Sequence, residues 1–154
     1  YHTFDLLGYA TTQLADAATA QGWPILLAMR VEDERHHHPL MKVPALALEQ
    51  AIAFARNLRH GRVVLCTATA VEVVGFLQGV ERAEAYAETS YLKGPLNALE
   101  DLVGKVGHER LLLGTHLPFS YAQTALAKVR EAPLSEAAKT AILGGNARRV
   151  FATN

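Results

Sequence analysis

Short apolar runs alternate along the chain with longer stretches in which apolar residues recur at helical spacing. Four runs stand out, at residues 24–29, 62–66, 85–89 and 111–114. Short runs that are apolar almost throughout are typical of parallel strands, because both faces of such strands are buried. The pattern therefore predicts an α/β fold in which a parallel sheet is covered by helices.

Between these runs the period changes to that of a helix, as at positions 48, 52, 55 and 58, whose side chains share one helical face. Helices are expected around residues 14–20, 48–58, 71–77, 96–106, 121–131 and 136–143. Ser135 is a suitable cap for the last of them, and Gly144 with Gly145 is expected to end it. Asn146 is then expected to cap a closing helix.

The length of the chain leaves two architectures open. Its 154 residues hold four strand-helix units, whereas a complete eightfold barrel needs roughly 250 residues. The chain is therefore either a small open doubly wound sheet of the flavodoxin kind, or part of a parallel (β/α) barrel. In the second case its open strand edges need cover from the missing barrel half or from another subunit.

Charge and cysteine content narrow the possible partners. The 15 basic and 15 acidic residues cancel and are scattered, so nothing indicates binding to nucleic acid or to a membrane surface. A small-molecule substrate is expected instead. The lone Cys66 excludes a disulfide within the chain and fits a cytoplasmic protein. The start at Tyr1, without a leader, is that expected of a chain that begins inside a domain.

Two motifs near the end carry a family resemblance. From Glu109 the chain reads Glu-Arg-Leu-Leu-Leu-Gly-Thr-His-Leu-Pro-Phe, and residues 146–151 read Asn-Ala-Arg-Arg-Val-Phe. This is similar to the tail of the amidohydrolase-related (amidohydrolase 2) TIM-barrel family, which includes aromatic-acid decarboxylases and lactone hydrolases. In that family the last strand typically reads Glu-Arg-(apolar)-(apolar)-Phe-Gly-Thr-Asp-x-Pro. Residues 20–25 also resemble the family's entry into the fifth strand.

The resemblance implies a fold and a chemistry. Residues 1–154 would form a single partial (β/α) barrel domain, the C-terminal portion of a (β/α)8 TIM barrel. It would contain about four βα units, strands five to eight, plus a closing helix. Members of the family use a divalent metal such as zinc, held at the carboxyl ends of the strands, where barrel enzymes carry out their reactions.

The same resemblance implies altered metal ligands. His116 stands where the family has the aspartate that acts as metal ligand or proton shuttle, and a histidine can serve either purpose. The family's histidines at the ends of the fifth and sixth strands are absent, because those ends read Leu-Ala-Met-Arg at 27–30 and Cys-Thr-Ala-Thr at 66–69. A divalent metal is therefore possible, but an intact ligand set is not present.

A charged loop follows the first predicted strand. Loops after barrel strands surround the active-site mouth, so this loop offers candidates for binding or protonating an anionic substrate. The alternative is a solvated surface loop. The candidates for catalysis in this loop are Arg30, Asp33 and Arg35, and those for substrate binding are Glu34 and His38.

Other candidates lie at the remaining strand ends. Glu88, with Ser90 beside it, follows the third predicted strand, and His2 lies at the presumed end of the strand before the first. His60 and His108 precede strands, which places them at the opposite, stabilising end of a barrel. Arg148 and Arg149 are expected to dock the closing helix rather than to bind substrate.

Three hypotheses follow. The first is an amidohydrolase-like, metal-dependent hydrolase acting on a small, possibly carboxylated substrate, with a related non-oxidative decarboxylase (a lyase) as its alternative. The second is a barrel that has lost catalysis and serves as a binding or scaffold subunit. The third is an independent flavodoxin-like domain, which requires a strand order that reverses around a central crevice.

Overall fold

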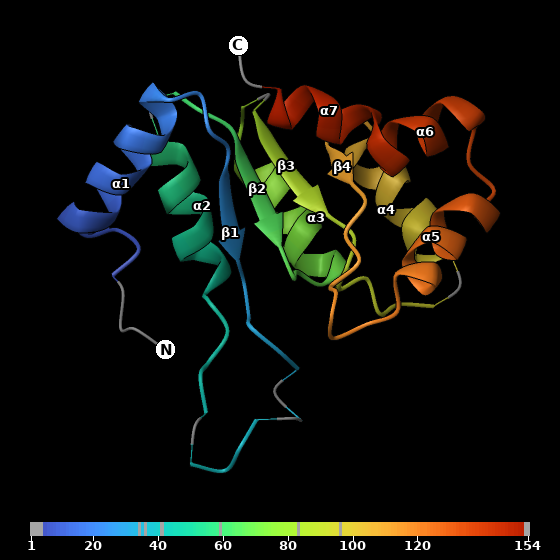
Figure 1. The fold of residues 1–154 in the computed structure, drawn as a ribbon, viewed down its shortest axis with the longest axis horizontal. Helices are drawn as coiled ribbons and strands as arrows, with labels where there is room; N and C mark the ends of the chain where they lie inside the picture. The colour runs from blue at the N-terminus through green and yellow to red at the C-terminus, as the bar shows by residue number, and fades with distance from the viewer. Residues whose placement is uncertain are drawn as a thin grey trace.

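Four parallel strands and a series of helices make up the computed structural model (Figure 1), which describes residues 5–33, 35, 37–40, 42–58, 60–82, 84–95 and 97–152. The strands are β1 (Ile25–Ala28), β2 (Val63–Cys66), β3 (Ala85–Glu88) and β4 (Leu111–Leu112). The helices are α1 (Tyr9–Ala20), α2 (Leu48–Asn57), α3 (Ala70–Gly79), α4 (Ala98–Val106), α5 (Ala122–Glu131), α6 (Glu136–Thr140), the π-helical η2 (Ala141–Gly145) and α7 (Asn146–Phe151). All four predicted strands are confirmed.

The strand order decides between the two architectures that the length left open. The sheet runs β1-β2-β3-β4, all parallel, with each strand beside the next one in sequence. A flavodoxin-like sheet needs an order that reverses, so that alternative is wrong. The fold is that of consecutive βα units in part of a (β/α) barrel.

Alternation along the strands divides their side chains between two layers. Val63, Leu65 and Ala87 point to the main hydrophobic core, which also contains residues of α2, α3 and α4 such as Phe54 and Phe76. Buried apolar side chains on the helices and strands thus interdigitate on this face. This layer fixes the sheet and, with it, the positions of the strand ends.

The opposite face of the sheet is covered by less of the chain. Val64, Tyr86 and Leu112 pack there against Val150 of α7. On the edge strand β1, Leu26 has 58% of its surface exposed although it belongs to the same face. Within the described residues β1 pairs with one neighbouring strand only, so its outer edge is open. The outer edge of β4 is covered, because the Leu113 N–H donates to the Ile142 carbonyl and the Leu111 carbonyl accepts from Asn146.

The closing helical segment agrees with the expectation except at Asn146. Ser135 caps α6 as predicted, since its hydroxyl accepts from the Ala138 N–H. Gly144 leaves the helical conformation, at φ 178° and ψ −20°, so the helix that begins with α6 ends at this kink as predicted, and α7 follows it. The prediction that Asn146 is an N-cap is wrong: it is buried, and its Nδ2 donates to the carbonyls of His108 and Leu111.

Arginines fasten the amino-terminal end of the sheet. Arg149 donates to the Glu109 carbonyl, which confirms that it docks the closing helix, whereas none of the described contacts gives Arg148 that role. Arg62 donates to the carbonyls of Gly22 and Ala152, and so joins the entry of β1 to the end of α7. Guanidinium groups suit this task because they carry several donors in a rigid fork.

None of the helices in the described part of the chain combines the length and the apolar character that a membrane span requires.

Candidate functional site

The carboxyl ends of the four strands meet at one edge of the sheet, as parallel strands require. All the arrows in Figure 1 point to this edge, from which the loops after β1, β2, β3 and β4 emerge. Arg30, Thr67, Glu88 and His116 follow or end successive strands, so residues far apart in sequence become neighbours. This edge is where barrel enzymes place their chemistry.

Arg30 forms a bidentate ion pair with Glu72 on the first turn of α3. Its Nη1 lies 2.9 Å from Glu72 Oε2 and its Nη2 lies 2.5 Å from Oε1. Burial would raise the pKa of Glu72, but the hydrogen bonds from Arg30 and Thr69 outweigh it and lower the pKa. Glu72 also closes a capping box with Thr69. The predicted catalytic residue Arg30 is therefore held in a structural pair.

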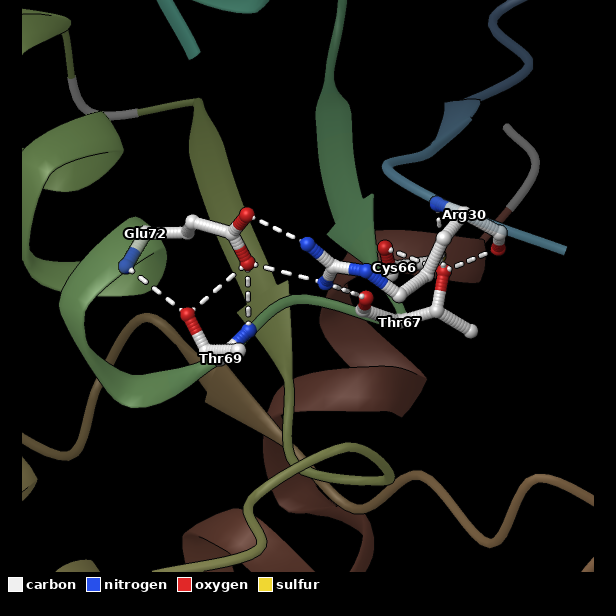
Figure 2. A network of polar contacts seen from close by, with 5 residues as sticks. All are labelled: Arg30, Cys66, Thr67, Thr69 and Glu72. Atoms are coloured by element: carbon white, nitrogen blue, oxygen red, sulfur yellow. Dashed lines mark hydrogen bonds and ion pairs between the residues drawn. The ribbon is translucent and has the colours of Figure 1, made fainter. Parts of the chain in front are cut away.

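Thr67 turns the chain at the end of β2 with a left-handed backbone, at φ 51°. This region is costly for a β-branched residue, and such outliers persist only where the surroundings hold them. The Thr67 carbonyl accepts from Arg30 Nη1 at 2.6 Å, and its hydroxyl donates to the Arg30 carbonyl at 2.7 Å. Figure 2 shows these contacts between the ends of β1 and β2.

The Glu88 carboxylate is fixed by several donors. The Thr67 N–H donates to its Oε1 at 2.5 Å, and the N–H and hydroxyl of Ser90 donate to Oε2 at 2.6 Å and Oε1 at 2.7 Å. Gly114 leaves room for the carboxylate, because a Cβ at that position would lie 1.5 Å from Glu88 Oε2. The sequence analysis placed Glu88 and Ser90 together near the end of the third predicted strand. In the structure the two residues are hydrogen-bonded to each other.

His116 lies on the loop after β4 and also has a left-handed backbone, at φ 53°. Its ring stands edge-on to Tyr91, with centroids 6.1 Å apart, and is tilted against Phe119 at 5.3 Å. The His116 imidazole is therefore packed between two aromatic rings.

Glu88 and His116 line one pocket of about 460 Å³. Its polar lining also includes Thr67, Ser90 and Thr115. Apolar side chains from the less covered face of the sheet, from the loop after β4 and from α7 complete it: Leu26, Val64, Leu112, Leu113, Leu117, Ala147 and Phe151. A mostly apolar hollow with a few converging polar groups is the usual form of a small-molecule site.

The charged loop after β1 is tied to the loop after β3. Asp33 pairs with Lys93 at 2.8 Å and with Arg35 at 2.7 Å. Hydrogen bonds from Arg35 and Lys93 hold the pKa of Asp33 well below its usual range. Lys93 also lies 4.0 Å from the centre of the Tyr91 ring, and the Arg30 guanidinium lies 5.0 Å from it. Asp33 and Arg35 therefore fasten the loop, and their catalytic roles stay predictions.

The remaining predicted candidates are not in this pocket or lie outside the described residues. His38 is exposed, and its Nδ1 accepts from the Leu40 N–H, so it does not line the pocket of Glu88 and His116. Glu34 and His2 lie outside the described residues. His60 precedes β2 and His108 precedes β4, at the end of the sheet opposite the pocket, as predicted.

The donor set does not fit a complete metal centre. Within the described ranges, no three His, Cys, Asp or Glu side chains come together in a way that could hold a metal ion. A zinc site needs at least three protein ligands. Burial, and then the charge of Glu88, raises the pKa of Cys66 to about 12, which keeps its thiol protonated, and both Glu88 oxygens are engaged by hydrogen bonds.

Sequence reasoning missed four residues of this site: Thr67, Glu72, Tyr91 and Lys93. The pattern Thr-x-x-Glu at 69–72 is a capping-box signal from which Glu72 could have been predicted as a residue at a helix start. Nothing in the local sequence shows that its carboxylate meets Arg30, which lies 42 residues earlier. The left-handed backbone of Thr67 had no sequence signal either, because glycine is the usual residue there.

The fold is similar to that of solved TIM-barrel proteins. 5-Carboxyvanillate decarboxylase from Sphingomonas paucimobilis matches with a TM-score of 0.71 at 16% identity, over 96% of this chain and 54% of that one. A dihydroxybenzoic acid decarboxylase from Polaromonas, with bound manganese and an inhibitor, matches with 0.67 at 17%, over 94% and 54%. An amidohydrolase from Burkholderia multivorans with bound zinc matches with 0.65 at 14%, over 96% and 58%.

These matches show the fold: the chain is a four-stranded parallel α/β unit with the architecture of part of a TIM barrel. It spans about half the length of the structures that it matches. No protein-family model matches the sequence. No curated protein matches it either.

Proposed function

We propose that the chain is the carboxyl-terminal half of an amidohydrolase-like barrel enzyme that cleaves a C–N, C–O or C–C bond in a small, carboxylated substrate. One observation carries this proposal: Glu88 and His116 line one pocket at the carboxyl ends of parallel strands. Active sites of barrel enzymes lie at that end. The likeness in fold to an amidohydrolase and to decarboxylases supports the same assignment.

In this proposal His116 transfers the proton. An imidazole exchanges protons near neutral pH, so it takes a proton from an attacking water and returns it to the leaving nitrogen or oxygen. Glu88 is held by backbone and side-chain donors, and it orients the substrate by accepting a hydrogen bond. The apolar part of the pocket takes the body of the substrate.

Decarboxylation is the second candidate, because several of the similar structures are decarboxylases of carboxylated aromatic compounds. His116 would then deliver a proton to the carbon atom that loses CO2. The same pocket serves either reaction, so the product distinguishes them: CO2 release marks the lyase, and a new alcohol, amine or acid marks the hydrolase.

A divalent metal ion enters the proposal through two of the similar structures, which hold manganese and zinc. His116 is the donor that this chain offers at its strand ends, and the other ligands would come from outside the described residues. We assign no step of the reaction to a metal. The competing hypothesis is a barrel that serves as a binding or scaffold subunit, which would bind a ligand without turning it over.

The proposal includes a partner for the open sheet. The exposed Leu26 and the open outer edge of β1 are the features that a further (β/α) half would cover. We place the assembled protein in the cytoplasm, where the lone Cys66 stays reduced.

The test is turnover by the purified chain, in its native assembly, on a panel of hydroxylated benzoic acids, lactones and amides. His116→Ala should lower kcat by a hundredfold or more, in line with the loss of a general acid-base group, which is typically about 10²–10⁴-fold. His60→Ala, at the other end of the sheet, should leave turnover unchanged. Equal turnover by the wild type and His116→Ala would remove the proposed mechanism, and ligand binding without turnover would favour the binding subunit.

A further inference from the structure

A chain of contacts leads from Glu72, on the first turn of α3, to Glu88 in the candidate site. Glu72 binds the Arg30 guanidinium through both carboxylate oxygens, and Arg30 binds the Thr67 carbonyl. The Thr67 N–H then donates to Glu88. Figure 2 shows the first part of this chain, which joins β1, β2 and α3.

The ion pair is shielded from water. The side chains of Arg30 and Glu72 keep only 10% and 20% of their surfaces exposed. A bidentate pair with this little exposure is geometrically specific, since both partners are fixed by two parallel hydrogen bonds. Arg30 is further confined by the Tyr91 ring, 5.0 Å away.

Thr67 connects the Arg30–Glu72 ion pair with the pocket, because it contacts both Arg30 and Glu88. It is clamped in both directions to Arg30, because its carbonyl accepts from the guanidinium and its hydroxyl bonds to the Arg30 backbone. The clamp offsets the cost of its left-handed backbone. In that conformation the Thr67 N–H meets Glu88 Oε1 instead of a neighbouring strand.

Resting on the proposed function, we propose that Glu72 is a positioning residue for Glu88. Acting through Arg30 and Thr67, it holds the Glu88 carboxylate in the pocket that Glu88 shares with His116. Without its anionic partner the Arg30 guanidinium loses the bidentate pair that orients it, and its hydrogen bond to the Thr67 carbonyl is weakened. Glu88 keeps its contacts with Ser90 but loses its link to β2.

Glu72→Gln is the informative variant. The glutamine keeps an amide oxygen that can accept from Thr69 and preserve the helix cap, but it removes the charge that pairs with Arg30. Glu136→Gln is the matched control, because Glu136 is also a first-turn glutamate in an ion pair, with Lys139 at 3.1 Å, and lies far out in solvent. Amide NMR resonances and hydrogen exchange of the full chain report the result.

In Glu72→Gln the Thr67 amide proton should shift upfield and exchange about tenfold faster, since a hydrogen bond to a charged acceptor is weakened. The Ser90 amide, which donates to Glu88 independently of Arg30, should keep its protection, and Glu136→Gln should leave both amides unchanged. An unchanged Thr67 amide in Glu72→Gln overturns the proposal. Equal loss of protection at Thr67, at Ser90 and throughout α3 also overturns it, because that pattern marks general destabilisation.

Arg30→Lys is the second variant for the case in which Glu72→Gln fails to fold, since lysine keeps the charge without the bidentate fork. Arg30→Lys should weaken the hydrogen bond from the Thr67 N–H to Glu88, and so speed the exchange of this amide proton as Glu72→Gln does. On a substrate that the wild type turns over, Glu72→Gln should lower kcat several-fold with little change in KM. If the wild type turns over no substrate, the proposed function fails, whereas the Thr67 amide still decides the positioning role.

Discussion

Gly114 lies against the Glu88 carboxylate, and this contact makes it a sensitive position. A Cβ at Gly114 would lie 1.5 Å from Glu88 Oε2 and 2.9 Å from Ser90 Cβ. We expect Gly114→Ala to lower the free energy of unfolding by about 1–3 kcal/mol, because the hydrogen-bonded carboxylate must move. Urea denaturation measures this change, and any turnover assay should record a loss of activity.

Gly104 provides the matched control. It lies inside α4, and a Cβ there would meet nothing within 4 Å. Gly104→Ala should raise the free energy of unfolding by about 0.5–1 kcal/mol, since alanine is the better helix residue. Equal effects of the two substitutions would show that the Glu88 carboxylate is not confined at Gly114.

Glu72 should make stability depend on pH. Its pKa in the folded protein is lowered from the model-peptide value of 4.5, so its contribution is fully present above that value. The contribution is lost as the pH falls through the lowered folded-state pKa, because the protonated form gains nothing from Arg30. The free energies of unfolding of wild type and Glu72→Gln should therefore differ at neutral pH and converge in acid.

Urea denaturation at a series of pH values from about 7 to about 3 measures this convergence. Glu136→Gln, which removes an exposed pair, should run parallel to the wild type. A constant difference between wild type and Glu72→Gln across the series would contradict the prediction.

At the scale of single residues, the sequence was sufficient to locate part of the candidate site. His116 and Glu88 could be named because each follows a recognisable strand, and the direction of parallel strands then places them at one edge. Arg30 could be named but its partner could not. Its ion pair with Glu72 joins the end of β1 to the first turn of α3, a tertiary contact that no local pattern specifies.

Among the elements, the closing helix depends on one buried side chain. Asn146 Nδ2 lies 2.7 Å from the carbonyls of both His108 and Leu111, and so ties the junction of η2 and α7 to the start of β4. Asn146→Ala should lower the free energy of unfolding by about 2–3 kcal/mol, because buried carbonyls lose their donor. Thermal or urea denaturation of the variant measures this loss.

Asn57, exposed at the end of α2, is the control position. Asn57→Ala should change the free energy of unfolding by no more than about 0.5 kcal/mol, as substitutions on open surface usually do. A loss at Asn146 as small as that at Asn57 would mean that the two carbonyl contacts contribute little.

The strands and the break in the closing helix were predictable, and the role of Asn146 was not. Apolar runs such as 62–66 reflect burial on both faces, and burial is what the sequence pattern records. Gly144 and Gly145 are typical helix-ending residues, and the chain kinks at Gly144. The contacts of Asn146 with the carbonyls of His108 and Leu111 depend on tertiary packing, which no local pattern specifies.

The molecule as a whole exposes more surface than a compact monomer of its size. Its accessible surface is 9346 Å², whereas a monomer of this mass is expected to expose about 7,600 Å². The open edge of β1 and the exposed Leu26 contribute to the excess. We expect the isolated chain to self-associate with rising concentration, as light scattering after size-exclusion chromatography would measure.

Leu26→Glu should weaken that association about tenfold or more, because an unpaired carboxylate would have to be buried on the inner sheet face. Val71, on α3, is 80% exposed, and Val71→Glu should leave the association unchanged. A chain that stays monomeric at every concentration, or equal effects of the two variants, would contradict this prediction.

The sequence by itself determined the class of fold, the four strands and the edge at which the candidate residues lie. It could do so because strand burial, helical period and strand direction are properties of short segments. The tertiary structure alone decided the sequential strand order, the pairing of Arg30 with Glu72 and the fixed Glu88 carboxylate. These depend on which segments pack together, and that is settled by the whole chain.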